Sequence, residues 1–589
     1  MPIRPLPNDP SVEHLRKQAK RLNKAVRAGD ADAVAHVREF HPRANDALAH
    51  FALSDAQLVT ARAYGFASWT RIKQHLAAIQ PFIWNVPPAP SDSTPPADRF
   101  IRLACLIYGN WHRSNPAAAR RLLADHPDLA SANVYAAAAA GDVEAVRTMI
   151  ERDPALVNAK GGPLNWEPLL YACYSRLDDG SPDRSTLEAV RVLLAHGADP
   201  NAGFLWGGTY LYTAVTGAFG RGEDNINELP HPRCFELAAL LLDAGADPND
   251  SQTLYNRHFE ENDDHLRLLF AYGLGRETHG PWQQRLADRS TSPATWLVQE
   301  LCWAAMHNFP DRVRLLIEHG VDVNASSPRS GRTPYQEARR EGNHAIAEYL
   351  LQHGAKKIEL DPIETFALAC IGGRRDEVRA RLAEDPAMLE KLGQRGRAEL
   401  IHRAVDGKQL DGVRLIVELG VDVNAMIPAS GLDRSPLHNA AGWGTLEMVK
   451  LLLELGADPN LRDTAYHAAP IGWAWHAQRE EVIEYLLQFA SIFDAVRCGG
   501  IERVAALLNQ NPSLAPESDS DGEPIVFCLH PEMTRMAEMI HLLTARGADL
   551  NARDSSGRTL LDRARVRGFT NFADILRTHG ARTAAELTY

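Results

Sequence analysis

The chain has 589 residues, of which 45% are hydrophobic and 23% charged. This length exceeds what a single globular domain with one hydrophobic core usually reaches, so several domains or an extended array are expected. Its net charge of −12 argues against a nucleic-acid footprint over the whole protein, because such a footprint would be basic. No apolar run approaches the roughly 18 residues needed to span a bilayer, and no secretory signal is visible, so a cytoplasmic location is expected.

Residues 1–80 are predicted to form a small helical module. Three helices are expected in it, and Ser54 and Ser68 are the predicted N-caps of the second and third. The expected helix ranges are 11–27, 54–64 and 68–79. Residues 81–97 are rich in proline, which disfavours helix continuation and sheet pairing, so this segment is predicted to be a linker.

The first of these helices carries a run of positive charge over residues 14–27. Its basic residues are Arg16, Lys17, Lys20, Arg21, Lys24 and Arg27. Such a run is usually a solvated helix face, but it could also contact an acidic partner, an anionic membrane surface or nucleic acid. No aromatic residues alternate with the charges, so stacking on bases is not indicated.

A repeated unit runs through residues 98–582, and its clearest copy is 435–460. Ser435 can cap a helix, and Pro436 suits the first helical position, where a missing N–H costs nothing. The following Ala440 is small enough to let neighbouring helices approach closely. The first half of the unit therefore predicts a short, closely packed helix.

The second half of the unit predicts another helix and a turn. Val449, Leu452 and Leu453 recur at helical spacing and form an apolar stripe. Gly456 is placed to end the helix with a positive φ, and the Asp-Pro-Asn sequence after it is typical of a turn.

The end of this unit recurs almost unchanged along the chain. Its Gly-x-Asp-x-Asn core is found at 197–201, 245–249, 320–324, 420–424 and 547–551. A variant replaces it with Pro-x-Leu, at 127–129, 154–156, 386–388 (with Met in place of Leu) and 512–514. About fourteen units of roughly 35 residues fit into the array.

The repeated unit resembles the ankyrin repeat, with its T-P-L-H head and G-A-D-x-N-A tail, and residues 1–80 look like the N-terminal segment of many bacterial ankyrin-repeat proteins. The resemblance implies an all-α solenoid of helix-turn-helix repeats with short finger loops. It also implies structural roles for His402 and His438, whose imidazoles would tie adjacent turns.

The expected divisions are a first array over 98–274, an insertion or hinge over 275–294, a second array over 295–582 and a tail over 583–589. Whether 275–294 is a hinge or a loop on one rim is left open.

In such a solenoid, the fingers and the first helix of each unit form a concave surface that contacts ligands. Large aromatic residues at these places are the predicted binding residues, because a few rigid aromatics carry much of the energy of an interface. They are Trp166, Phe204, Trp206, Tyr212, Trp443 and Trp475. Core packing is the alternative for each, and it is the favoured interpretation for Trp475 but not for Trp206 or Trp443.

No phosphate loop, dinucleotide fingerprint, nucleophile elbow or zinc-protease motif occurs. The seven cysteines are scattered and never form C-x-x-C. His231, Cys234, His258 and His265 could supply metal ligands, but their spacing fits no recognised site. We therefore expect no catalytic residues, no metal and no cofactor.

The sequence favours a non-enzymatic scaffold that binds another protein through its concave face and fingers. It is expected to be monomeric, with no specific nucleic acid as partner and no membrane span. Two alternatives remain: an enzyme with an unrecognised active site in residues 1–80 or in an insertion, and attachment to an anionic surface through the helix over 14–27.

Overall fold

The computed structural model divides into two compact units, Met1–Leu301 with Arg314–Val321, and Cys302–Val313 with Asp322–Tyr589. The residues that it describes are 6–7, 10–88, 90, 94–109, 114–178, 184–223, 227–276, 280–286, 292–359, 361–427, 433–519, 522–531 and 533–587. Helices dominate both units, and the fold is an all-α solenoid. No helix in these ranges is both long and apolar enough to cross a membrane.

The first unit opens with the predicted helical module. Its helices are α1 Val12–Arg27, α2 Ala31–Phe40, α3 Ala44–Ala49, α4 Leu53–Ala63 and α5 Trp69–Ile79. The hydroxyl groups of Ser11 and Ser68 cap α1 and α5, the second as predicted. The predicted cap Ser54 is wrong, because it lies within the first turn of α4, where the Asp55 carboxylate accepts the N–H of Ala52 at 2.9 Å.

The segment expected to be a linker contributes a strand. After the 3-10 helix η1 Gln80–Phe82, the strand β1 Ile83–Trp84 pairs in parallel with β2 Gly203–Trp206, which forms a hairpin with β3 Tyr210–Thr213. Leu205 of β2 joins the apolar core of the helical module. This part of residues 81–97 is therefore structured and fastens the module to a finger of the array.

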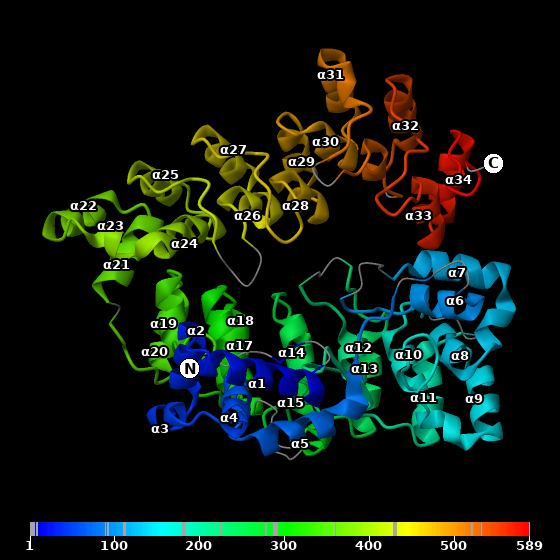
Figure 1. Cartoon of the computed structure of the whole chain (residues 1–589), viewed down its shortest axis with the longest axis horizontal. Helices are drawn as coiled ribbons and strands as arrows, with labels where there is room; N and C mark the ends of the chain where they lie inside the picture. Colours follow the sequence, from blue (N-terminus) through cyan, green and yellow to red (C-terminus); the bar gives the residue numbers. More distant parts are fainter. Residues whose placement is uncertain are drawn as a thin grey trace. The chain divides into compact units, whose positions relative to one another are not determined.

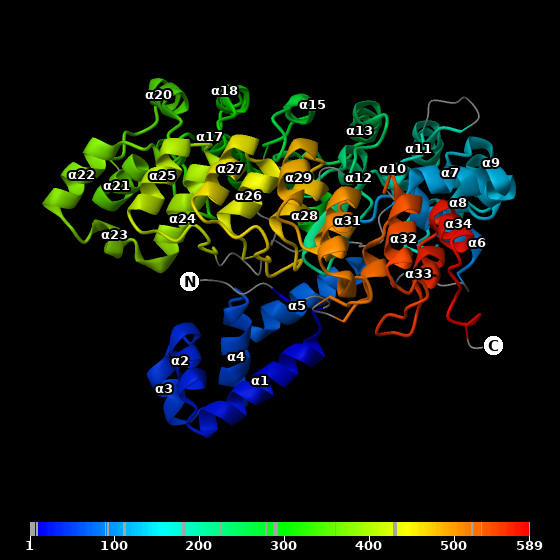
Figure 2. The ribbon, with the colours of Figure 1, turned by 90° about the horizontal axis from the view of Figure 1, so that it is seen from above.

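The array of the first unit is built from successive helix pairs. Its helices are α6 Pro96–Ala104, α7 Pro116–Asp125, α8 Val134–Ala140, α9 Val143–Arg152, α10 Pro168–Tyr174, α11 Thr186–Ala195, α12 Ala214–Phe219, α13 Cys234–Asp243, α14 Ser251–Arg257 and α15 Asp264–Ala271. The inner helices α6, α8, α10, α12 and α14 contact one another in that order. The outer helices α9, α11, α13 and α15 do the same, and Figure 2 shows them following one another along the unit.

Residues 275–294 contain α16 Pro281–Arg285. The indole of Trp282 is 5% exposed, packs against the ring of Phe82 at 4.9 Å and donates to the Asn201 carbonyl at 3.1 Å. This part of the expected insertion or hinge therefore belongs to the interior of the first unit. Residues 277–279 and 287–291 lie outside the described residues.

The second unit continues the pattern of helix pairs. Residues of both units form α17 Pro293–Met306 and α18 Pro310–Glu318. The second unit then contains α19 Pro334–Arg340, α20 His344–Gln352, α21 Pro362–Ile371, α22 Arg375–Glu384, α23 Met388–Lys391, α24 Gly393–Asp406, α25 Leu410–Glu418, α26 Pro436–Trp443, α27 Leu446–Glu454, α28 Pro470–His476, α29 Glu480–Leu487, α30 Ile492–Arg497, α31 Ile501–Gln510, α32 Met536–Ala545, α33 Leu560–Val566 and α34 Thr570–Thr578. Figure 1 shows its inner helices α21, α24, α26 and α28 side by side in one row.

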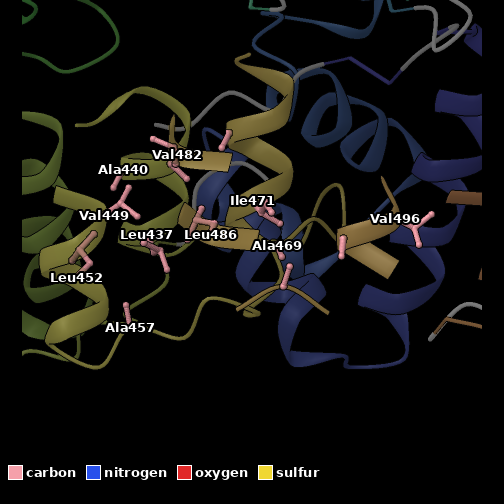
Figure 3. Packing of buried hydrophobic residues seen from close by; sticks show 14 of the residues in the cluster. Leu437, Ala440, Val449, Leu452, Ala457, Ala469, Ile471, Val482, Leu486 and Val496 are labelled. Carbon is pink, nitrogen blue, oxygen red and sulfur yellow. The ribbon is translucent and has the colours of Figure 1, made fainter. Parts of the chain in front are cut away.

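The core of the second unit lies between its inner and outer helices. Val449 and Leu452 of α27 are fully buried and lie near Leu437 and Ala440 of α26 (Figure 3). The predicted stripe of α27 is confirmed for these two residues, and Leu453 is partly buried beside them. Small residues such as Ala440 let α26 pack closely against both neighbouring inner helices, α24 and α28.

The recurring asparagine joins several of the repeats to the next one. The Asn424 side chain accepts the Asp458 N–H at 2.8 Å and donates to the Gly456 carbonyl at 3.4 Å, one repeat further on. Gly456 has the predicted positive φ, of 94°, which presents its carbonyl in the turn. Paired bonds of this kind are also made by Asn158, Asn201, Asn324 and Asn551.

The Pro-x-Leu variant has a different exit turn, as predicted. In three copies the proline opens a short 3-10 helix directly after the outer helix. These are η2 Pro127–Ser131, η3 Pro154–Asn158 and η4 Pro512–Leu514. Another 3-10 helix, η5 Ile525–Cys528, stands where other repeats have their first helix.

Candidate interaction surface

Trp443 ends α26 on the inner-helix side of the second unit. It is 46% exposed, and among the described tryptophans it alone is exposed. Its Nε1 donates to the Asp406 Oδ1 atom at 3.0 Å, and its ring lies 5.6 Å from that of Trp473. A large apolar side chain is thus presented to solvent and held in one position.

Asp406, at the end of α24, accepts hydrogen bonds from two side chains of α26. Its Oδ1 also accepts from the Asn439 Nδ2 atom at 2.9 Å. Although Asp406 as a whole is exposed, neighbouring groups crowd its carboxyl group, and this desolvation raises its pKa, while the bonds from Trp443 and Asn439 oppose the shift. One carboxylate therefore links two inner helices and fixes the indole.

Arg434, in the finger before α26, lies against both indoles. Its guanidinium carbon is 5.4 Å from the Trp443 ring centroid and 5.6 Å from that of Trp473, within cation–π range. Its Nε donates to the Asn439 Oδ1 atom at 2.6 Å. Burial lowers the pKa of Arg434, and the Asp406 carboxylate opposes this. Within the described ranges, its two terminal nitrogens make no hydrogen bond.

His402 and His438 have the structural role that was predicted. The Ser435 N–H donates to His438 Nδ1 at 3.1 Å, so the proton is on Nε2, which donates to the Ala468 carbonyl of the next finger at 3.0 Å. His402 bonds the Ala425 carbonyl at 2.9 Å in the same way. Burial lowers the pKa of both imidazoles, that of His402 to about 4.

The two tryptophans of α28 are half-buried. Trp473 Nε1 donates to the buried Asp463 carboxylate at 2.9 Å, in the finger before the helix. Trp475 packs against the imidazole of His530, with ring centroids 4.8 Å apart. Packing against His530 therefore accounts for much of the Trp475 side chain. Trp473, by contrast, lies beside Trp443, and together with Asp406 and Arg434 these residues form what we call the surface around Trp443.

Three predicted binding residues of the first unit are in its core. Trp166, Phe204 and Tyr212 are 1%, 3% and 6% exposed. Phe204 stacks on Trp166 at 5.0 Å and on Tyr212 at 5.6 Å, and Trp84 of β1 covers it at 4.8 Å. The prediction of these three as surface contacts is wrong, because Trp84 of β1 packs against Trp166 on one finger and against Phe204, which shares the next finger with Tyr212. Trp206, on the same finger, is half-buried.

Two of the residues weighed as metal ligands, His231 and His258, lie against other protein groups. His231 bonds the Thr186 hydroxyl at 2.7 Å, and burial lowers its pKa to about 3. His258 lies 3.2 Å from a carboxylate oxygen of Glu300. In the described part of the chain, no three His, Cys, Asp or Glu residues gather in a group that could hold a metal ion.

The comparisons with known proteins agree with this architecture. A family model described as ankyrin repeats (3 copies) matches residues 299–361 and 401–494, and the second range contains the surface around Trp443. Rabankyrin-5 of Mus musculus is 27% identical over 195 residues, which are 32% of this chain and 16% of that protein. Rabankyrin-5 of Homo sapiens is 26% identical over 193 residues, with the same two shares.

The match thus spans less than a fifth of these relatives, so it bears on the repeats and not on their whole-protein activity. The repeats themselves are supported by three agreeing observations: the recurring sequence unit, the stacked helix pairs and the family model. Residues 299–361 and 401–494 of this chain are thus ankyrin repeats.

Proposed function

We propose that this chain is a non-enzymatic scaffold that binds another protein through the concave, inner-helix and finger face of its second unit. The observation that carries the proposal is Trp443, an exposed indole held by Asp406 and flanked by Arg434. A rigid aromatic loses little conformational entropy on binding, so it serves well as the anchor of an interface.

The groups around the anchor suggest how a partner would be oriented. The terminal nitrogens of Arg434 are free to donate to an acceptor, and a guanidinium matches a carboxylate in a bidentate pair. We therefore expect the partner to place an apolar side chain on Trp443 and an acidic side chain beside Arg434.

A binding role suits the polar groups of this surface better than catalysis. The carboxylate of Asp406 and the imidazoles of His402 and His438 are engaged in bonds that hold the indole and the turns. We further propose that the chain acts as a monomer in the cytoplasm, which sedimentation and cell fractionation would test.

Exchange of Trp443 for alanine tests the proposal. Truncating an anchor costs about 2 kcal/mol or more, which is about thirtyfold in Kd. We expect the Trp443→Ala chain, used as bait in the source lysate, to lose a prey protein that the wild type captures. Folding should be retained because the indole is half exposed, and melting curves check this.

Phe489→Ala is the matched control. Phe489 is a 37% exposed aromatic of the same unit, next to the outer helix α29. The control should capture the same prey as the wild type. A prey set that is identical for all three baits would contradict the proposed surface.

A further inference from the structure

The outward face of α1 gathers six positive charges. Arg16, Lys17, Lys20, Arg21, Lys24 and Arg27 are all exposed. At about 100° per residue they cover an arc of about 140°, over a helix length of about 17 Å. Residues 1–80 carry twelve Lys and Arg against seven Asp and Glu, a net charge of +5 in a chain whose total is −12.

Little of this charge is neutralised within the protein. Glu13 pairs with Lys17 at 2.8 Å, and Arg27 donates to the Phe51 carbonyl at 3.3 Å. In the described part of the chain the other four basic residues, Arg16, Lys20, Arg21 and Lys24, make no ion pair. Four long, flexible cations therefore face solvent on one side of one helix.

The opposite face of α1 is occupied. Leu15, Ala19 and Val26 are buried in the apolar cores of the helical module, where α1 packs against α4. Inserting this face into a hydrocarbon layer would require the module to open. Any surface that α1 binds must therefore be held by charge alone.

We propose that this face of α1 binds the anionic surface of a lipid bilayer peripherally, without insertion. The charges are spread over two dimensions, as negative headgroups are, and each cation near an anionic leaflet contributes about 1 kcal/mol. Attachment of this kind is weak, additive and reversible.

Features of the same helix disfavour nucleic acid as the occupant. None of its exposed residues is Phe, Tyr or Trp, so the helix offers bases no large aromatic platform. The two amides that could read base edges are engaged: Gln18 accepts from the Tyr64 hydroxyl at 3.0 Å, and Asn23 donates to the Phe51 carbonyl at 3.5 Å.

Sedimentation of the full chain with lipid vesicles tests the proposal. The wild type should sediment with phosphatidylserine-containing vesicles but not with pure phosphatidylcholine vesicles. It should be released at about 1 M salt, where the screening length falls to about 3 Å. Lys20→Gln with Lys24→Gln should lower the partition coefficient by about tenfold or more, because two of the additive charges are lost.

The control removes two charges elsewhere. Arg121 and Arg152 are exposed on other helices of the first unit, so Arg121→Gln with Arg152→Gln makes the same change in net charge. It should bind vesicles like the wild type, as should Trp443→Ala, which separates this proposal from the protein-binding one. Equal losses in both double variants, no wild-type binding to anionic vesicles, or retention by a duplex DNA without vesicle binding would each overturn it.

Discussion

Asn424 shows how single residues hold the repeats together. The sequence predicted only a turn at this position, because a local pattern reveals the turn but not the neighbouring repeat that the side chain reaches. The structure adds two hydrogen bonds to the next repeat, one to the Asp458 N–H and one to the Gly456 carbonyl. The asparagine thus recurs because its amide can donate and accept at once.

Asn424→Ala is expected to lower the free energy of unfolding by about 1 kcal/mol, because two exposed hydrogen bonds to the next repeat are lost. Asn424→Asp keeps the acceptor for Asp458 but not the donor for Gly456, so its loss should be smaller. Urea unfolding followed by circular dichroism measures both. Equal stability of the alanine variant and the wild type would show that the bridge contributes nothing.

The buried imidazoles predict a pH dependence of stability. Burial lowers the pKa of His402 from 6.5 to about 4, so the unfolded chain binds more protons than the folded one between these values. The contribution of neutral His402 to stability is therefore present above pH 6.5 and is lost as the pH falls toward about 4. His438, whose pKa is also lowered, acts in the same direction.

The urea midpoint should accordingly fall as the pH is lowered from neutral toward that range, and His402→Gln should weaken this dependence. Guanidinium chloride is unsuitable here because its ions screen charge. A midpoint that rises on acidification would contradict the sign derived for these imidazoles.

At the scale of elements, the strand β1 explains why some aromatic predictions failed. Trp166 and Phe204 lie on the fingers where the repeat pattern placed them, but Trp84 covers them from a segment far away in the chain. Trp84 Nε1 donates to the Leu164 carbonyl at 2.7 Å, 80 residues away. Periodicity and turn signals carry no information on such a contact.

Trp84→Ala is expected to destabilise the first unit by about 3–5 kcal/mol, the usual range for removing a buried large aromatic. Its backbone carbonyl accepts the Gly207 N–H at 3.0 Å, so loosening of β1 should also speed hydrogen exchange at that amide. Trp84→Phe, which keeps a ring, should lose less. Unchanged exchange at Gly207 in the alanine variant would mean that β1 does not depend on this indole.

Other elements were predictable because their signals are local. The α27 stripe, the Gly456 turn, the Pro-x-Leu exits and the cap of α5 all follow from residues within a few positions. The position of Trp443 after a small-residue helix face was also predicted. The hydrogen bond that holds the Trp443 indole in place was not predicted, because its acceptor Asp406 lies 37 residues earlier, on another helix.

At the scale of the whole molecule, the family model matches the stretches where head and tail motifs occur together, and both stretches lie after residue 298. The first unit departs from the repeat pattern in two ways. The strand β1 covers the finger formed by β2 and β3, and several polar side chains are buried in its interior. Arg176, for example, is buried and donates to the carbonyls of Gly217 and Leu229. A helix pair can thus keep its place in the solenoid after its consensus residues are replaced.

The proposed roles lie on different parts of this molecule. The surface around Trp443 is aromatic and belongs to the second unit, whereas the charged face of α1 belongs to the first. The two sets share no residue, so the variants that test them should act independently.

The central claim is that the inner-helix face of the second unit binds a protein partner. Photo-crosslinking with a benzophenone side chain in place of Tyr466 tests it most directly, because Tyr466 is 58% exposed on the finger that supports Trp473. We expect a crosslinked partner from this position and none from the same group in place of Phe489. Crosslinks from both positions, or from Phe489 alone, would contradict the account.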